Sequence, residues 1–172
     1  MKTRREILQG MIVSIGGSAL LTACEGVARI TPSPADRPKF YSPVELALVT
    51  KISDLIIPRT DTPGATDVNV SGFLDSLMTE WANADTQQNH HRAIRVIDDQ
   101  LGQTFIALDR KSAEEQLTSL DARAYAGRPR EYSAYRSIKG LITQAYFASE
   151  AGKLLEQEWV AVPGRWDPSV EI

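Results

Sequence analysis

Apolar residues recur at intervals of three and four in five stretches of this chain, which is the spacing of one face of an α-helix. No stretch alternates apolar and polar residues with a period of two, so no β-strand is predicted. The pattern therefore predicts an all-α fold: an irregular bundle of about five helices with an extended, aromatic C-terminal tail. The predicted helices span about residues 42–57, 68–82, 86–107, 112–120 and 131–148, and the tail spans residues 159–172.

Local signals sharpen some of these ends. Ser42-Pro43-Val44-Glu45 has the form of a capping box with proline at the first helical position, and Tyr41 and Leu46 can form a hydrophobic staple around it. Ser112 and Glu115 suggest a second capping box. Between the first two helices, residues 58–70 contain two prolines, a glycine and two aspartates, which predicts an ordered loop.

The first 23 residues have the features of an export signal. Arg4 and Arg5 are followed by an uncharged apolar run from Gly10 to Leu21. As a helix this run would be roughly 18 Å long, which is too short for a hydrocarbon core of about 30 Å. The segment is therefore predicted to be a signal peptide rather than a membrane span, and the adjacent arginines indicate the bacterial twin-arginine (Tat) route.

Cys24 directly follows the small residues at the end of that signal, an arrangement that resembles a bacterial lipobox. We expect Cys24 to be the lipid-anchored first residue of the mature protein, at the start of a proline-containing tether over residues 24–41. The alternative is an ordinary signal followed by a chance cysteine. Because Cys24 is the only cysteine, an intramolecular disulfide is excluded.

The remaining 149 residues suffice for one domain, predicted over residues 42–172. Removing the signal takes away three of the 19 basic and one of the 22 acidic residues, which leaves a net charge of −5. A mildly acidic chain without a basic cluster is a poor candidate for nucleic-acid binding, so none is predicted. It also has no polybasic patch for anionic lipid, so membrane contact would depend on the Cys24 lipid.

Candidate chemistry is sparse. His90 and His91 are the only histidines, and adjacent helical residues point about 100° apart, so we interpret them as solvated surface residues. No metal-binding, haem-attachment, dinucleotide-binding or nucleophile-elbow motif occurs. Asp61 and Asp67 flank a glycine turn, where they can hold Ca²⁺ or, more simply, cap the loop and the next helix. No catalytic, cofactor-binding or metal-binding residue is assigned.

Two regions suit contact with another molecule. One is the loop from Pro58 to Val70, where proline and glycine restrict an exposed backbone. The other is the tail, where Trp159, Pro163 and Trp166 offer the kind of side chain that often anchors interfaces. The alternative for both tryptophans is that they cover the helical core.

These two regions resemble the gluconate 2-dehydrogenase subunit 3 family, the small subunits of membrane-associated, flavin-dependent dehydrogenases. The likeness runs from about Ser42 to Trp166. Asn69 stands where the family commonly has glycine, and both residues tolerate a left-handed backbone. The likeness is carried by Ile56-Ile57-Pro58, Asp61, Pro63-Gly64-Ala65, Val70 and Phe73-Leu74-Asp75, and later by Tyr146-Phe147-Ala148-Ser149-Glu150 and Pro163-Gly164.

The resemblance implies a non-catalytic subunit that pairs with a large flavoprotein of the glucose-methanol-choline type, often together with a multihaem cytochrome c. FAD is then expected in the partner and no cofactor in this chain, which would support the folding, Tat export and anchoring of the large subunit in the periplasm. The partner-binding candidates are Pro58, Asp61, Pro63, Gly64, Tyr146, Ser149, Trp159, Pro163, Gly164 and Trp166.

Two other functions remain open from the sequence. A stand-alone helical envelope lipoprotein, acting as a binding or scaffold module, fits the same signal and helices. An enzyme in its own right needs a cofactor or metal for which the sequence has no motif.

Overall fold

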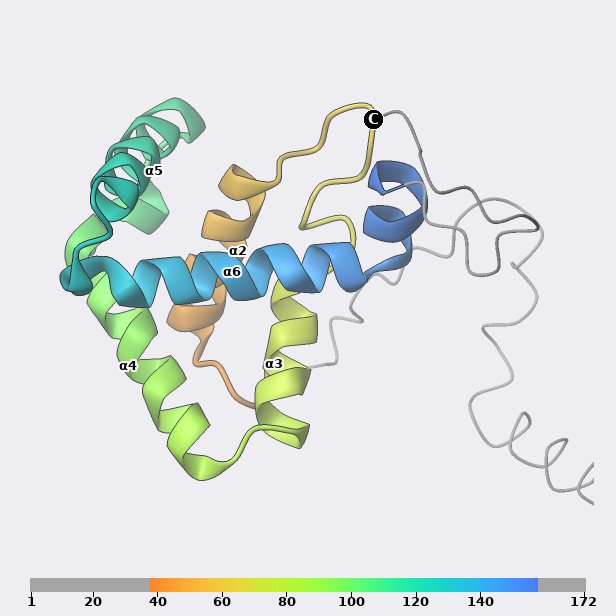
Figure 1. The fold of residues 1–172 in the computed structure, drawn as a ribbon, viewed down its shortest axis with the longest axis horizontal. Coiled ribbons are helices and arrows are strands. Elements are labelled where there is room, and N and C mark those ends of the chain that lie inside the picture. Colours follow the sequence, from red (N-terminus) through yellow and green to blue (C-terminus); the bar gives the residue numbers. More distant parts are fainter. Residues whose placement is uncertain (1–37, 158–172) are drawn as a thin grey trace, which may run out of the picture. The chain divides into compact units, whose positions relative to one another are not determined.

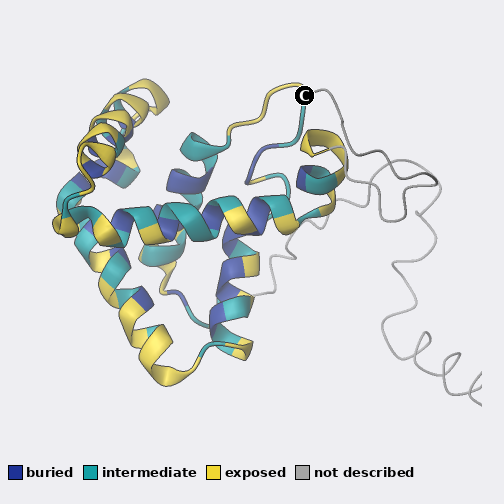
Figure 2. Ribbon diagram, in the orientation of Figure 1, coloured by how far each residue is buried: buried dark blue, intermediate teal, exposed yellow. Residues whose placement is uncertain are grey.

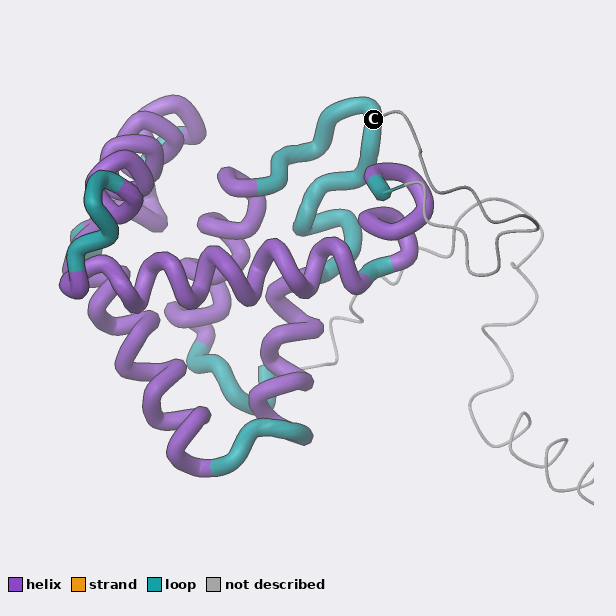
Figure 3. Tube along the Cα trace, viewed as in Figure 1, coloured by secondary structure: helices purple, strands orange, loops and turns teal. Residues whose placement is uncertain are grey.

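A computed structural model describes residues 38–157 of the 172-residue chain. Arg4, Arg5 and Cys24 lie outside the described residues, as do Trp159, Pro163, Gly164 and Trp166, so those predictions remain predictions. The described part contains five α-helices and no β-strand (Figure 3), which confirms the all-α prediction. The elements are α2 (Pro43–Ile56), α3 (Val70–Glu80), α4 (Ala84–Leu101), the 3-10 turn η1 (Phe105–Ala107), α5 (Arg110–Tyr125), the 3-10 turn η2 (Arg130–Tyr132), α6 (Ser133–Ala148) and the π-helical turn η3 (Gly152–Glu156).

Helix α6 is the element around which the other helices pack (Figure 1). It contacts α3 and α4 most extensively and also touches α2 and α5. Its buried face repeats at helical spacing, so each turn contributes one large side chain to a single core. Figure 2 shows this buried stripe, whereas exposed residues gather on α5 and on the N-terminal half of α4. The buried face of α6 consists of Tyr135, Ile138, Ile142, Ala145 and Tyr146.

The start of α2 agrees with the sequence prediction. Ser42 is the N-cap, its hydroxyl accepts the Glu45 N–H at 3.3 Å, and the Glu45 carboxylate accepts the Ser42 N–H at 2.9 Å. The capping box therefore satisfies two backbone donors that the helix itself leaves unpaired. Tyr41, just before the cap, is buried in the core, and Leu46 packs partly buried against the same core.

The helix predicted from Thr86 to Ala107 is wrong at both ends. Asn83 accepts the Thr86 N–H at 2.8 Å and starts α4 at Ala84. The helix ends at Leu101 because Gly102 has a φ of +79°, a left-handed backbone that stops a right-handed helix. Phe105 belongs to the separate turn η1, where it is fully buried.

Helix α5 is longer than predicted, and Ser112 is not its cap. Asp109 is the N-cap, because its carboxylate accepts both the Ser112 N–H and the Ser112 hydroxyl. The helix therefore begins at Arg110 and runs to Tyr125 rather than from Ser112 to Leu120. At the next boundary, a 3-10 turn precedes α6, which begins at Ser133 instead of Glu131.

Helix α3 is shorter than the predicted 68–82 helix. Asn69 is its N-cap, and its φ of +53° is the left-handed conformation expected where the family commonly has glycine. The Asn69 side chain accepts the Gly72 N–H at 3.2 Å. Among residues 38–157, no helix is long and apolar enough to cross a membrane.

Candidate functional site

The loop between α2 and α3, residues 57–69, folds back on the end of α2. Ala65 donates its N–H to Ile57 O at 2.9 Å, and Val70 donates to Ala65 O at 3.0 Å. Ala65 is fully buried at this crossing. Two backbone hydrogen bonds thus connect the end of α2, the middle of the loop and the start of α3, so the loop has a defined shape without regular secondary structure.

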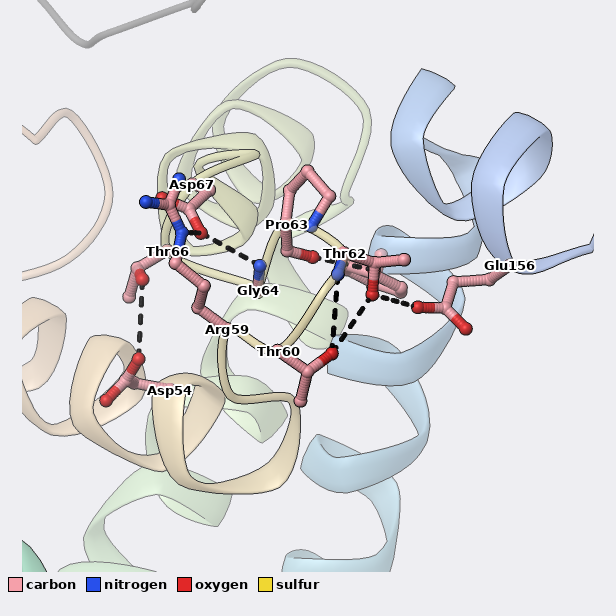
Figure 4. Close-up of polar contacts among 10 residues, drawn as sticks. Asp54, Arg59, Thr60, Thr62, Pro63, Gly64, Thr66, Asp67 and Glu156 are labelled. Atoms are coloured by element: carbon pink, nitrogen blue, oxygen red, sulfur yellow. Dashed lines mark hydrogen bonds and ion pairs between the residues drawn. The ribbon is translucent and has the colours of Figure 1, made fainter.

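Gly64 is required by space at the same crossing. A Cβ on this residue would lie 2.6 Å from Arg59 N, 2.8 Å from Pro58 C and 2.9 Å from Ile57 O. All three are backbone atoms, which cannot move away as the end of a flexible side chain can. Figure 4 shows the Gly64 N–H directed at the Asp67 carboxylate beside this crossing. The side chain of any other residue at position 64 would push these two backbone segments of the loop apart.

Asp67 closes the turn from the other side. Its Oδ2 accepts the Gly64 N–H at 2.9 Å and the Arg59 Nε–H at 2.8 Å (Figure 4). Of the two roles considered for Asp67, loop capping is therefore the one its contacts support. Asp61 is exposed at the tip of the loop, and the described residues contain no group of three or more His, Cys, Asp or Glu side chains arranged for a metal ion.

The loop is attached to the C-terminal end of α6. Tyr146 donates its hydroxyl to Pro63 O at 2.7 Å, and the Thr62 hydroxyl donates to Glu156 in η3. Burial raises the pKa of Tyr146, and the nearby charge of Glu156 adds to the effect, so the phenol keeps its proton and donates at neutral pH. This bond joins residues 83 positions apart.

Ser149 and Gly152 direct the chain from α6 toward that loop. Ser149 Oγ donates to Tyr146 O at 2.6 Å and accepts the Gly152 N–H at 3.2 Å, which turns the chain after α6 ends. A Cβ on Gly152 would collide with Tyr146 O, so this turn also depends on glycine. The result is that η3 packs beside α6 and presents Glu156 to Thr62.

We call this assembly of residues 57–69, the end of α6 and η3 the loop–helix junction. It contains six of the predicted partner-binding residues. Gly64 and Tyr146 are buried and shape the junction from inside, whereas Pro63 and Ser149 are partly buried. The exposed edge of the junction is formed by the loop tip from Pro58 to Asp61 and by two leucines of η3, Leu154 (49% exposed) and Leu155 (55% exposed).

A second set of contacts was missed by the sequence analysis. The buried carboxylate of Asp75 accepts three consecutive backbone N–H groups: those of Phe40 and Tyr41 on Oδ1, at 3.0 and 2.8 Å, and that of Lys39 on Oδ2, at 2.9 Å. Hydrogen bonds to a charged acceptor are about twice as strong as neutral ones. We call these residues, together with His90, the N-terminal clamp, because they hold the segment before α2 against α3.

The interpretation of His90 and His91 as solvated surface residues is wrong for His90. Only 6% of His90 is exposed, and its Nε2 lies 2.7 Å from the Tyr41 hydroxyl. Burial lowers the pKa of His90 to about 4, with a further contribution from His91, so His90 is neutral at pH 7 when it hydrogen-bonds to the Tyr41 hydroxyl. The missed signal was spacing, since His90 precedes Ile94 by four residues and Ile97 by seven on the buried face of α4.

His91 is half-buried beside the clamp. Its ring stacks on Phe40 with centroids 4.1 Å apart, and its Nδ1 lies 2.7 Å from Glu45 Oε1. Burial raises the pKa of Glu45, but the hydrogen bonds from Ser42 and His91 lower it more, so the net shift is downward. The two histidines therefore make different contacts: His90 bonds to Tyr41, and His91 contacts Phe40 and Glu45.

The junction and the clamp each hold segments of backbone in place. Within each region, the polar groups form hydrogen bonds with one another. Together with the all-α architecture, they define a small helical domain with an ordered, exposed loop edge. The sequence model of the family "Gluconate 2-dehydrogenase subunit 3" matches residues 43–164, which is most of the chain. The chain belongs to this family, whose name designates a subunit of a multi-subunit dehydrogenase. Comparison with curated proteins and with solved structures finds no match.

Proposed function

We propose that this chain is the accessory small subunit of a flavin-dependent sugar or sugar-acid dehydrogenase and that it acts by binding the larger catalytic subunit. Membership in a family named for a dehydrogenase subunit supports this proposal. The observation that carries it is the loop–helix junction, whose internal contacts hold one exposed loop edge in a fixed position. A pre-organised surface loses little conformational entropy on binding, which favours a stable complex.

The exposed edge of the junction is the proposed contact surface. The loop tip from Pro58 to Asp61 lies next to η3, because Thr62 bonds to Glu156. Leu154 and Leu155 add apolar area beside this polar tip. An apolar centre with a polar rim is the usual composition of a protein–protein interface. Gly64 and Tyr146 contribute by setting the shape of this surface rather than by contact.

The chemistry in this proposal belongs to the partner. FAD is bound by the large subunit, of the glucose-methanol-choline type, and a multihaem cytochrome c receives the electrons in complexes that contain one. This chain supplies no cofactor ligand and supports the folding of the flavoprotein. The resemblance of the motif residues to the family supports these assignments.

The proposed route to the periplasm uses the signal of this chain. Arg4 and Arg5 direct Tat export, which carries folded proteins and so suits a partner that has already bound FAD. Lipid attached to Cys24 then holds the complex at a membrane on the periplasmic side. The sequence of residues 1–24 supports this route.

Co-expression with the candidate flavoprotein tests the proposed subunit role. We expect the flavoprotein to be soluble, exported and active only when this chain is present. Replacing Leu155 by Arg should lower co-purification about tenfold, since a charge in an apolar interface loses its hydration. The matched control is Ala122→Arg, an exposed position on α5. An exported, active flavoprotein in the absence of this chain would refute the proposal, and a stable monomer without any partner would favour the stand-alone lipoprotein.

The export route has its own test. Replacing Arg4 and Arg5 by lysine should leave both subunits in the cytoplasm, because the twin-arginine signal is lost. Replacing Cys24 by serine should release the exported complex from membranes into the soluble periplasmic fraction. If mass spectrometry finds an unmodified Cys24 in the native protein, the lipid anchor fails while the subunit role stands.

A further inference from the structure

The corner between α3 and α4, residues 81–85, presents a tryptophan to solvent. Trp81 is 82% exposed, more than any other large hydrophobic side chain in the described part of the chain. Its backbone is nevertheless ordered, because Trp81 N–H bonds to Leu77 O at 3.1 Å and Asn83 caps α4 immediately afterwards. An indole held in solvent by a fixed backbone buries little area in this fold and is available for contact with another molecule.

The N-terminal segment reaches the domain at this corner. The Asp75 carboxylate fixes the backbone of Lys39 and Phe40 against α3. The same two residues line a hollow of about 290 Å³ together with residues from the end of α3 and the start of α4. Figure 1 shows the segment before α2 lying beside the C-terminal half of α3. The other residues that line the hollow are Thr79, Ala84, Gln87, Gln88 and His91.

Covalent geometry limits how far this corner can be from Cys24. The thirteen residues 25–37 separate Cys24 from Pro38, so fourteen Cα–Cα steps join these two residues, and at about 3.5 Å per step they span at most roughly 50 Å. If lipid holds Cys24 in a membrane, Pro38 stays within that distance of it, and the corner that Lys39 and Phe40 line can reach the membrane surface. This step rests on the lipid anchor in the proposed function.

We propose that the α3–α4 corner is a second membrane contact, in which the Trp81 side chain enters the boundary between lipid headgroups and acyl chains. An indole suits this boundary because its ring is apolar and its N–H can still reach a polar partner. The lipid at Cys24 supplies the attachment, and a second contact at Trp81 fixes which face of the domain meets the membrane. Glu80 and Asp85 flank the indole, so the corner fits a zwitterionic surface rather than an anionic one.

Fluorescence of Trp81 on vesicles tests the proposal directly. Replacing Trp159 and Trp166 by phenylalanine leaves Trp81 as the only tryptophan of the three in the chain. Because Cys24 is the only cysteine, the chain from residue 24 onward can be coupled through it to maleimide lipid in phosphatidylcholine vesicles. With brominated acyl chains in these vesicles, Trp81 emission should fall at least about twofold relative to unbrominated ones, and it should shift to shorter wavelength.

A matched control moves the reporter to another surface. Combining Trp81→Phe with Tyr125→Trp places the indole at the end of α5, at a residue that is 41% exposed. This indole should not be quenched, since Figure 1 places α5 toward the opposite end of α6 from α3. Unchanged Trp81 emission, or equal quenching at both positions, would overturn the proposal.

The accessibility of Trp81 distinguishes lipid from the catalytic partner as the occupant of the corner. In the purified wild-type complex without vesicles, hydroxyl radicals should oxidise Trp81 as readily as in the free chain, as measured by peptide mass spectrometry. Protection of Trp81 in that complex would overturn the membrane assignment and identify the corner as a subunit interface. Coupling through maleimide does not depend on lipidation in the cell, so a failure of the anchor at Cys24 and a failure of the Trp81 contact are seen separately.

Discussion

The loop–helix junction depends on two glycines at which backbone segments cross closely, whereas the N-terminal clamp depends on buried side chains that come from α3 and α4. In the junction, Gly64 and Gly152 let chain segments cross at distances that no Cβ tolerates. In the clamp, a buried carboxylate accepts the N–H groups of residues 39–41, and a neutral imidazole hydrogen-bonds to the Tyr41 hydroxyl. The junction should therefore be sensitive to added volume, and the clamp to lost charge and to protonation.

The largest effect is expected from Gly64→Val. The new side chain would meet three backbone atoms of residues 57–59, so the loop must open, at a cost of about 3 kcal/mol in the free energy of unfolding. Urea denaturation measures this change. The matched control is Gly140→Ala in α6, where a Cβ meets nothing within 4 Å and the helix should gain about 0.5–1 kcal/mol. Equal stability of Gly64→Val and wild type would contradict the close crossing.

Asp75→Asn should weaken the clamp by about 2–3 kcal/mol, slightly less than the loop substitution. Keeping the amide oxygen at Oδ1 preserves the bonds from Phe40 and Tyr41, but it places an NH₂ group against the Lys39 N–H. Two donors then face each other at a buried site. Urea denaturation and hydrogen exchange at residues 39–41 measure the loss. Glu80→Gln, an exposed change on the same helix, should alter stability by less than about 0.5 kcal/mol. An Asp75→Asn protein with wild-type stability and exchange would refute the clamp.

Lowering the pH should also affect the N-terminal clamp and the loop–helix junction differently. The pKa of His90 is about 4 in the folded domain, below its ordinary value of 6.5, so the unfolded chain binds more protons between these pH values. Stability therefore falls as the pH is lowered through this window, by about 2 kcal/mol from pH 7 to pH 5. Urea denaturation at each pH measures it. The pKa of Glu45 is shifted downward, so the loss of its contribution is confined to lower pH.

His90→Gln is the control for the acid effect, because the glutamine amide can still form a hydrogen bond with the Tyr41 hydroxyl but does not titrate. The variant should lose most of the pH dependence between pH 7 and pH 5. A wild-type slope in this variant would assign the acid sensitivity to another group.

The smallest effect on stability is expected at the exposed edge of the junction. Asp61→Ala should change the free energy of unfolding by less than about 0.5 kcal/mol, since Asp61 is exposed at the loop tip. If the edge binds the catalytic subunit, the same change should reduce co-purification severalfold. A large loss of stability would mean that Asp61 belongs to the structural interior of the junction. Unchanged co-purification would remove it from the contact surface.

The sequence alone determined the features that depend on neighbouring residues. Helical spacing predicted five α-helices, and Ser42 with Glu45 predicted the cap of α2. Proline and glycine indicated an ordered loop between α2 and α3, and the motif residues identified the family before any contact was known. These predictions hold because capping, periodicity and turn formation act over a few residues. Helix ends were predicted less well, since Asp109 and Ser112 are both able to cap α5 and their mutual geometry decides which one does.

Only the tertiary structure decided what the distant residues do. Asp75 meets residues 34–36 positions earlier, and Tyr146 meets a carbonyl 83 positions away. No local pattern predicts such contacts, because they form only after several helices pack around a single core. His90 likewise was predicted at the surface, but it is buried and hydrogen-bonded to the Tyr41 hydroxyl. Packing also left Trp81, at the end of α3, outside the core.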